Sequence, residues 1–182
     1  MPSTLTRTTL HAATERAKHS IVESYFGRTQ DRSEAPVSLL LDDRPGHALQ
    51  VLPDVDRPVL VVTANRSMHY LLDVLEQEPE GLLVTPTLPP AQVLEGYLSR
   101  IAAGERFYEG PPPSKSLLTP KEREVLRRTM YGESTEKLAA SLSITPYTAG
   151  EHLRHIREKL DVERNAELVL AYFAGDAARL AV

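Results

Sequence analysis

Short apolar runs in the first part of the chain alternate with longer amphipathic stretches. The runs Pro36–Leu41, Pro58–Ala64 and Gly81–Thr85 are bounded by turn residues and predict buried strands. Because these runs alternate with helical patterns, this part of the chain is expected to form a parallel α/β sheet. The stretches whose apolar spacing predicts helices are Thr9–Gly27, Ser67–Glu78 and Pro89–Gly104.

The pattern becomes entirely helical after Tyr108–Ser116, which contains three consecutive prolines. Such a run cannot continue a helix and favours an extended spacer. We therefore predict a linker over 108–116, between a domain at 1–107 and a domain at 117–182. Thr119 followed by Pro120 and Glu122 is typical of a capped helix start. The helices predicted in the second domain, which include a helix-turn-helix unit, are Thr119–Gly132, Ser134–Leu142, Pro146–Leu160 and Asn165–Gly175.

The helix predicted at Pro146–Leu160 has one apolar face and one polar face. Its apolar residues are spaced by four, three and four positions and are expected to face inward: Ala149, Leu153, Ile156 and Leu160. A helix exposed on its other face fits the DNA major groove, where side chains reach base edges and phosphates. The residues assigned to DNA contact are Tyr147, Thr148, Gly150, Glu151, His152, Arg154, His155 and Lys159, with Thr135 and Lys137 on the preceding helix.

Composition and charge narrow the function classes. The 182 residues contain no cysteine, which excludes disulfides, thiolate catalysis and cysteine-based zinc sites. The net charge of −4 opposes non-specific nucleic-acid binding. However, residues 115–182 have 11 Lys and Arg against 10 Asp and Glu, and a near-neutral domain can bind DNA if its cations share one face. Because neither a signal-peptide pattern nor an apolar run of membrane-spanning length is present, we expect a cytoplasmic protein that does not associate with membranes.

The C-terminal residues from Leu118 to Gly175 resemble the LuxR/GerE-type DNA-binding domain. The matching positions are Leu118-Thr119-Pro120, Glu122, Glu124-Val125-Leu126, Gly132, Leu138-Ala139, Leu142, Ile144, Thr148, His152, Ile156, Lys159-Leu160, Val162, Arg164 and Ala166-Glu167-Leu168. The resemblance implies a four-helix domain that binds double-stranded DNA and pairs on a two-fold site, usually through its last helix. The residues that would form this homodimer contact are Leu168, Val169 and Tyr172.

Two positions depart from the pattern of that family. Lysine is usual where this chain has Gly150, and a small apolar residue is usual where it has Glu151. The resemblance thus implies DNA binding with an altered sequence preference, in which Arg154 reads or holds the duplex and Thr148, His152 and Lys159 anchor phosphates. Glu151 could accept a hydrogen bond from cytosine N4, or it could repel phosphate together with Glu158.

Residues Val37 to Pro112 are similar to the second half of a response-regulator receiver domain. The resemblance rests on Pro58–Ala64, Gly81–Thr85 and Leu94–Phe107. It implies that Asp42 or Asp43 stands where receivers have the phosphoacceptor aspartate that ends their third strand. By the same comparison, Thr63 matches the threonine that ends the fourth strand, and Thr85 stands where receivers have a lysine.

The chemistry of phosphoryl transfer is incomplete in this region. It needs a divalent cation held by carboxylates near the acceptor, and receivers provide an acidic pair after their first strand. The sequence before Ala35 indicates no strand followed by two carboxylates. A different register would make Asp42 and Asp43 that pair, but then too few residues remain for a full domain. Alternatively, both aspartates only begin a turn before Pro45-Gly46. We therefore expect Asp42, Asp43, Thr63 and Thr85 to be a vestigial phosphoacceptor region without conventional phosphorylation.

Taken together, the sequence predicts a transcriptional regulator that acts by binding and not by catalysis. Its expected architecture is a truncated or atypical receiver-like α/β domain followed by an all-α four-helix helix-turn-helix domain. No metal or cofactor is expected, since His152 and His155 lie one turn apart but have no obvious third ligand. The alternative is a protein-interaction module that captures another regulator or an RNA polymerase subunit, which the mixed charge of the exposed helix face favours. A metal-dependent phosphotransfer enzyme is the least supported reading.

Overall fold

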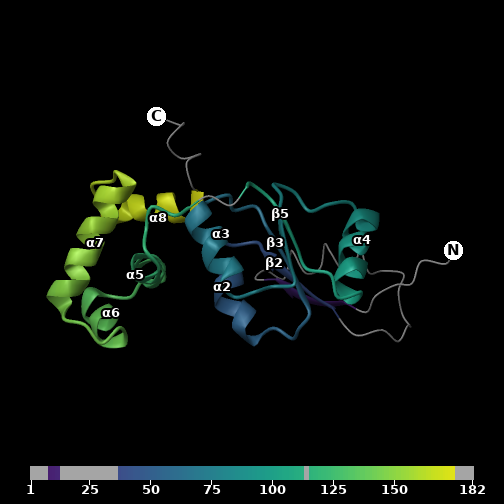
Figure 1. Cartoon of the computed structure of the whole chain (residues 1–182), viewed down its shortest axis with the longest axis horizontal. Coiled ribbons are helices and arrows are strands. Elements are labelled where there is room, and N and C mark those ends of the chain that lie inside the picture. Colours follow the sequence, from purple (N-terminus) through teal and green to yellow (C-terminus); the bar gives the residue numbers. More distant parts are fainter. Residues whose placement is uncertain (1–7, 13–36, 113–114, 175–182) are drawn as a thin grey trace. The chain divides into compact units, whose positions relative to one another are not determined.

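In the part of the chain that the structure describes, five parallel strands form one sheet in the order β1-β2-β3-β4-β5 (Figure 1). The computed structural model describes residues 8–12, 37–112 and 115–174. The strands are β1 (Thr8–Ala12), β2 (Val37–Asp42), β3 (Val59–Thr63), β4 (Gly81–Val84) and β5 (Phe107–Glu109). The predicted strands at Pro36–Leu41, Pro58–Ala64 and Gly81–Thr85 are confirmed, and they correspond to β2, β3 and β4. The register places Asp42 beside Thr63, so the carboxyl ends of β2 and β3 meet.

Strand β1 corrects the helix predicted at Thr9–Gly27. Its first residues are extended and pair in register with β2, from Thr8 beside Val37 to Ala12 beside Leu41. The rest of that predicted helix lies outside the described residues. The prediction was wrong for Thr9–Ala12 because pairing with a neighbouring strand is a tertiary interaction, and such context overrides a weak local preference. A strand therefore does precede Ala35, and the two residues that follow it are Ala13 and Thr14 rather than carboxylates.

The central strands are buried on both faces, which explains why their sequences are continuous apolar runs and do not alternate. All five residues of β3 are buried. On one face, helix α4 (Ala91–Ala102) inserts Leu94, Leu98 and Ile101 against Leu39 and Leu60. Helix α2 (His47–Val51) and the short helix η2 (Leu52–Asp54) follow β2 and bury Ala48, Leu49 and Leu52. The helix predicted at Pro89–Gly104 is thereby confirmed.

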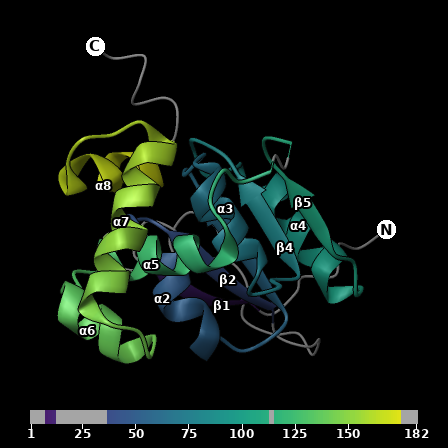
Figure 2. The ribbon, with the colours of Figure 1, turned by 60° about the vertical axis from the view of Figure 1, so that its left-hand side comes forward.

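Within the described residues 115–174 the chain forms four helices (Figure 2). They are α5 (Pro120–Met130), α6 (Thr135–Ser141), α7 (Pro146–Leu160) and α8 (Asn165–Ala174). The predicted capping box is present: the Thr119 hydroxyl accepts from the Glu122 amide, and the Glu122 carboxylate accepts from the Thr119 amide. Ser134 accepts from the Lys137 amide and caps α6. Helix α7 packs against α5, α6 and α8, and its apolar face is central to this part of the fold.

The chain divides into two compact units, Met1–Asn65 with Val74–Pro112 and Arg66–Asp73 with Pro113–Val182. Helix α3 (Met68–Leu75), which confirms the helix predicted at Ser67–Glu78, contributes to both. The segment predicted as a linker, 108–116, begins within β5, since Tyr108 and Glu109 belong to that strand. None of the helices in the described ranges combines the length and the apolar character that crossing a lipid bilayer requires.

Candidate nucleic-acid interface

Helix α7 is held by a cap at each end and by a buried apolar stripe. The Thr145 hydroxyl accepts a hydrogen bond from the Thr148 amide, and Pro146 occupies the first turn. At the other end Asp161 adopts a left-handed conformation with φ of 53° and ends the helix. The four residues expected to face inward, Ala149, Leu153, Ile156 and Leu160, are all buried, as predicted. This packing fixes which side chains of α7 remain outside.

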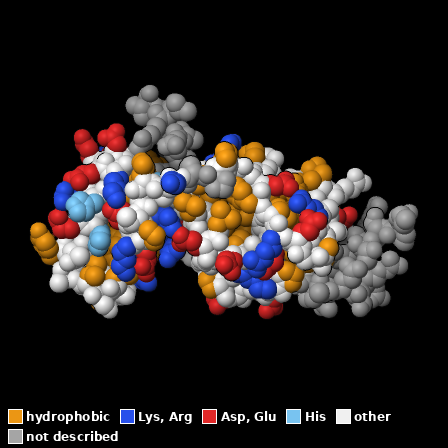
Figure 3. Space-filling model, viewed as in Figure 1, with side chains coloured by type: hydrophobic (Ala, Val, Ile, Leu, Met, Phe, Trp, Pro, Cys, Tyr) orange, Lys and Arg blue, Asp and Glu red, His pale blue; other side chains and the backbone are white. Residues whose placement is uncertain are grey.

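The outward face of α7 has mixed chemistry. Tyr147 leaves 78% of its surface exposed near the start of the helix. Thr148, Gly150, Glu151 and His152 are partly exposed, whereas Arg154, His155 and Lys159 are exposed. Cationic, anionic and histidine side chains are intermixed over α7 in the space-filling view (Figure 3). The residues assigned to DNA contact on this helix therefore share one accessible face.

Arg154 forms ion pairs with two carboxylates of its own helix. Its Nη2 and Nε donate to Glu151 at 2.9 and 3.4 Å, and its Nη1 donates to Glu158 at 2.5 Å. The Nη2 atom also lies 2.8 Å from His155 Nε2. These carboxylates raise the pKa of Arg154, and Arg154 lowers the pKa of Glu151. The spacing of three and four residues is that of side-chain pairs along a helix, so the sequence contained a signal for these ion pairs.

The other two cations of α7 also have partners within the protein. Lys159 Nζ donates to both carboxylate oxygens of Glu122 in α5, at 2.7 and 2.8 Å. Arg157 Nη1 donates to the Asn165 side chain at 2.8 Å. Burial would raise the pKa of Glu122, but hydrogen bonds from Lys159 and Thr119 outweigh it and lower that pKa. Lys159, expected to anchor phosphate, thus also links α7 to the helix cap of α5.

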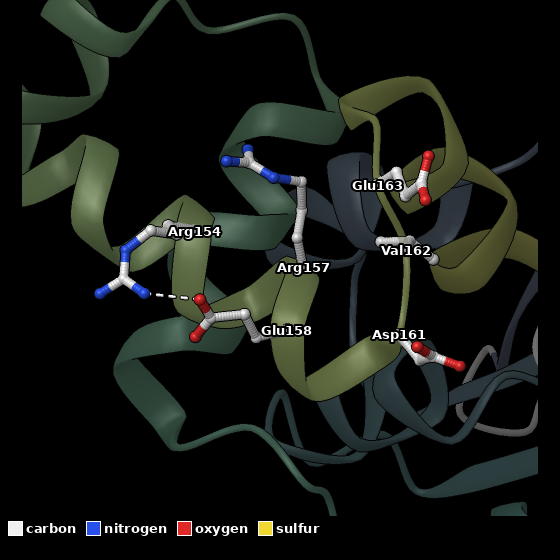
Figure 4. Close-up of a pocket in the computed structure, with 6 residues that line it drawn as sticks. All are labelled: Arg154, Arg157, Glu158, Asp161, Val162 and Glu163. Carbon is white, nitrogen blue, oxygen red and sulfur yellow. Dashed lines mark hydrogen bonds and ion pairs between the residues drawn. The ribbon is translucent and has the colours of Figure 1, made fainter.

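An open cavity of about 380 Å³ lies beside this cluster, at the C-terminal end of α7. Figure 4 shows Arg154 and Glu158 meeting along α7, while the Arg157 side chain extends in another direction. The cavity is lined by residues of mixed charge: Arg154, Arg157, Glu158, Asp161, Val162 and Glu163. Within the described ranges, no group of three or more His, Cys, Asp or Glu side chains could hold a metal ion.

The two remaining positions assigned to DNA contact lie on α6. Thr135 is the first residue of that helix and is partly exposed, and Lys137 is exposed. Gly150 in α7 has open space around it, since a Cβ built there would meet no atom within 4 Å. Close packing within this chain therefore does not require a glycine at that position.

The residues assigned to the dimer contact fall into two groups. Leu168 and Tyr172 are fully buried, whereas 41% of Val169 is exposed, and its neighbour Leu170 is 57% exposed. The Tyr172 hydroxyl donates to Asp73 at 2.5 Å within the second unit. Burial raises the pKa of Asp73 despite the Tyr172 hydrogen bond and the nearby Arg127 and Arg123. No local sequence pattern indicates the role of Asp73, because the two bonded residues are 99 positions apart.

The region assigned as a vestigial phosphoacceptor is organised around Asp42. The Thr63 hydroxyl donates to Asp42 Oδ2 at 2.6 Å, and the Ala48 amide in the first turn of α2 donates to Asp42 Oδ1 at 3.0 Å. Asp43 is exposed and precedes the turn at Pro45-Gly46. The Thr85 hydroxyl donates to the Thr87 carbonyl, and its amide donates to the Thr63 carbonyl at 2.9 Å. The structure thus brings Asp42, Thr63 and Thr85 to the carboxyl edge of three adjacent strands.

Comparisons with known proteins cover the two parts of the chain unequally. Residues 116–172 match the profile described as "Bacterial regulatory proteins, luxR family". The transcriptional regulatory protein MctR of Rhizobium johnstonii is 38% identical over 66 residues, which are 36% of this chain and 29% of that protein. The nitrate/nitrite response regulator protein homolog of Haemophilus influenzae is 27% identical over 132 residues, which are 65% of this chain and 62% of that protein. The chain thus spans less than two thirds of the length of these relatives.

Among solved structures, RcsB from Salmonella enterica serovar Typhimurium bound to the promoter rprA has a similar fold. The TM-score is 0.51 at 18% identity, and the match covers 94% of this chain and 99% of RcsB. This likeness supports the predicted architecture of a receiver-like α/β domain followed by a helical domain. Residues 116–172 are therefore similar to the luxR family of bacterial regulatory proteins, and in this chain they follow a receiver-like α/β domain.

Proposed function

We propose that the protein is a bacterial transcriptional regulator that binds double-stranded DNA through α7 and is not controlled by conventional aspartyl phosphorylation. The observation that supports DNA binding most strongly is the exposed polar face of α7, held by a buried apolar stripe inside a luxR-family domain. In this proposal Arg154 contacts bases, Thr148 and His152 contact phosphates, and Thr135 and Lys137 add contacts from α6. Lys159 is assigned to phosphate as well, at the expense of its bond to Glu122.

The proposal for the α/β domain rests on the surroundings of Asp42. Its two carboxylate oxygens accept hydrogen bonds from Thr63 and from the first turn of α2. Thr85 provides a hydroxyl where receivers have a lysine, and Ala13 and Thr14 follow β1 where receivers have carboxylates. The negative charge that develops during phosphoryl transfer would therefore meet neither a bound metal ion nor a lysine side chain. We infer a scaffolding or signal-receiving role for this domain.

DNA binding is tested by incubating the full chain with a pool of random duplexes at two salt concentrations, followed by sequencing of the bound fraction. A two-fold motif is expected, with affinity that falls as salt rises. Arg154→Ala should weaken binding to the motif, whereas Lys121→Ala, which removes an equal charge from the exposed surface of α5, should not. Absence of any enriched sequence together with salt-independent behaviour would refute DNA binding.

The phosphorylation proposal is tested by incubating the chain with acetyl phosphate and Mg²⁺ and measuring its intact mass. No phosphoryl adduct is expected. An adduct that disappears in the Asp42→Asn or Asp43→Asn variant would overturn the proposal, because it would show that one of these carboxylates still accepts phosphate.

A second candidate function is capture of another regulator or an RNA polymerase subunit by α7. The specific observation in its favour is that Arg154, Arg157 and Lys159 all have partners within the protein. Arg154 and Lys159 pair with carboxylates, and Arg157 donates to an amide side chain. Such engagement reduces the positive field that attracts phosphate. The random-duplex experiment distinguishes protein capture from DNA binding, because protein capture predicts no enriched motif at either salt concentration.

A further inference from the structure

The Arg154 guanidinium has five N–H donors, and two neighbouring carboxylates accept hydrogen bonds from different edges of it. Glu151 takes the edge formed by Nε and Nη2, and Glu158 takes Nη1. Both carboxylates lie on α7, one turn before and one turn after Arg154. With two carboxylates around one guanidinium, this group of three residues, here called the Arg154 clamp, has an excess of negative charge.

An excess of negative charge affects the two kinds of DNA contact differently. A phosphate is an anion and is repelled by the second carboxylate, so a clamped arginine is a poor phosphate anchor. A guanine edge is neutral and offers the O6 and N7 acceptors, while its cytosine partner offers the N4 donor that a carboxylate can accept. A guanidinium held beside a carboxylate is therefore better matched to a G·C pair than to the backbone.

We propose that the Arg154 clamp is a specificity device that confines Arg154 to reading a G·C pair and suppresses its binding to phosphate. This inference rests on the proposed DNA-binding function and deepens it. Glu151 is the positioning residue, because its two bonds orient the guanidinium along the Nε edge. The Nη1–Nη2 edge, beside which Glu158 and His155 now lie, is then the edge that turns to guanine. Glu158 is the competitor, because it occupies the Nη1 donor that guanine needs and leaves only when a base replaces it.

Removing the charge of Glu151 and removing that of Glu158 should therefore change DNA binding in different ways. Both changes are measured by the affinity for duplexes at several salt concentrations. The probes are the motif enriched from the random pool, a scrambled duplex, and the motif with its G·C pairs replaced one at a time. Glu158→Gln should tighten binding to the scrambled duplex several-fold and steepen the salt dependence by about one phosphate contact. Glu151→Gln should reduce discrimination at one G·C position by roughly tenfold, since the bidentate contact loses its orientation.

Glu163→Gln is the matched control, because it removes the same charge from an exposed residue of the same unit that is not a partner of Arg154. A second control repeats Glu158→Gln in an Arg154→Ala background, where its effect should shrink to that of Glu163→Gln. Circular dichroism of each variant verifies that α7 remains folded.

Each outcome distinguishes the clamp from the proposed function. If the wild-type protein recovers a motif but Glu158→Gln and Glu163→Gln behave alike, DNA binding stands and the clamp is overturned. If the wild-type protein recovers no motif but Glu158→Gln binds duplexes in a salt-dependent way that Glu163→Gln does not, the clamp is supported and the proposed function of the native chain fails. If no variant binds any duplex, both are overturned.

Discussion

Lys159 Nζ lies 2.7 and 2.8 Å from the two carboxylate oxygens of Glu122, and this pair joins α7 to the cap of α5. One oxygen of the same carboxylate accepts from the Thr119 amide at 2.8 Å and completes the capping box. The Glu122 side chain is almost fully buried, whereas 38% of the Lys159 side chain is exposed. A single acidic residue thus couples the start of α5 to the orientation of α7.

We expect Lys159→Met to destabilise the helical unit by about 1–2 kcal/mol, because it leaves the buried Glu122 carboxylate without its cation. Urea unfolding followed by the helical circular dichroism signal measures this change. Lys121→Met removes an exposed lysine that pairs with Glu124 and should change the stability by less than about 0.5 kcal/mol. Equal effects of the two substitutions would show that the Lys159–Glu122 pair contributes no more than a surface ion pair.

The Glu122 carboxylate should also make the stability depend on pH. Its pKa in the folded protein lies below the ordinary value of 4.5, so its contribution is fully present above that value and is lost as the pH falls through the folded-state pKa. The difference in unfolding free energy between the wild type and Glu122→Gln should therefore shrink on acidification below pH 4.5. Urea titrations at a series of pH values measure it, and a difference that grows on acidification would contradict the assigned direction.

Gly150 should tolerate a side chain. Gly150→Ala is expected to stabilise α7 by about 1 kcal/mol, because alanine loses less conformational entropy in a helix and its Cβ would meet no atom within 4 Å. Gly132 has φ of +81°, so Gly132→Ala in the same unit should instead be destabilising. Thermal melts of the two variants compare them. A lower melting temperature for Gly150→Ala would show that the helix needs glycine there.

The Thr63–Asp42 hydrogen bond should be structural. Thr63→Val preserves the shape of the side chain but removes the donor at 2.6 Å from Asp42, and we expect a loss of about 1–3 kcal/mol. Thr85→Val removes an exposed bond to the Thr87 carbonyl and should cost less than about 0.5 kcal/mol. Chemical unfolding of the two variants provides the comparison, and a neutral Thr63→Val would indicate that Asp42 is satisfied without this hydroxyl.

The exposed residues of α8 should be the ones that contribute to self-association. Val169→Glu is expected to shift a dimer toward monomer without unfolding the chain, because 41% of Val169 is exposed. Leu168→Ala should instead cost about 2–5 kcal/mol of stability, since Leu168 is fully buried. Sedimentation velocity together with thermal melts separates the two effects. An unchanged dimer in Val169→Glu would place the contact elsewhere.

Features that depend on neighbours along the chain could be predicted from the sequence. The capping box of Thr119 and Glu122 requires only a three-residue spacing, and the structure contains it. The buried stripe of α7 follows from the helical period, and Ala149, Leu153, Ile156 and Leu160 are buried as that period requires. The Arg154 clamp belongs to the same class, because Glu151 and Glu158 lie three and four residues from Arg154 on one helix.

Features that join distant segments were decided by the tertiary structure. The pair of Lys159 and Glu122 spans 37 positions, and the pair of Asp42 and Thr63 spans 21, so no local spacing indicates either one. Strand β1 likewise depends on its partner β2, whose hydrogen bonds outweigh the local preference of Thr9–Ala12. By itself, the sequence determined the capped start of α5 and the buried stripe of α7, because these need only the local geometry of a helix. The engagement of Lys159, by contrast, was decided when packing brought Glu122 of α5 beside α7.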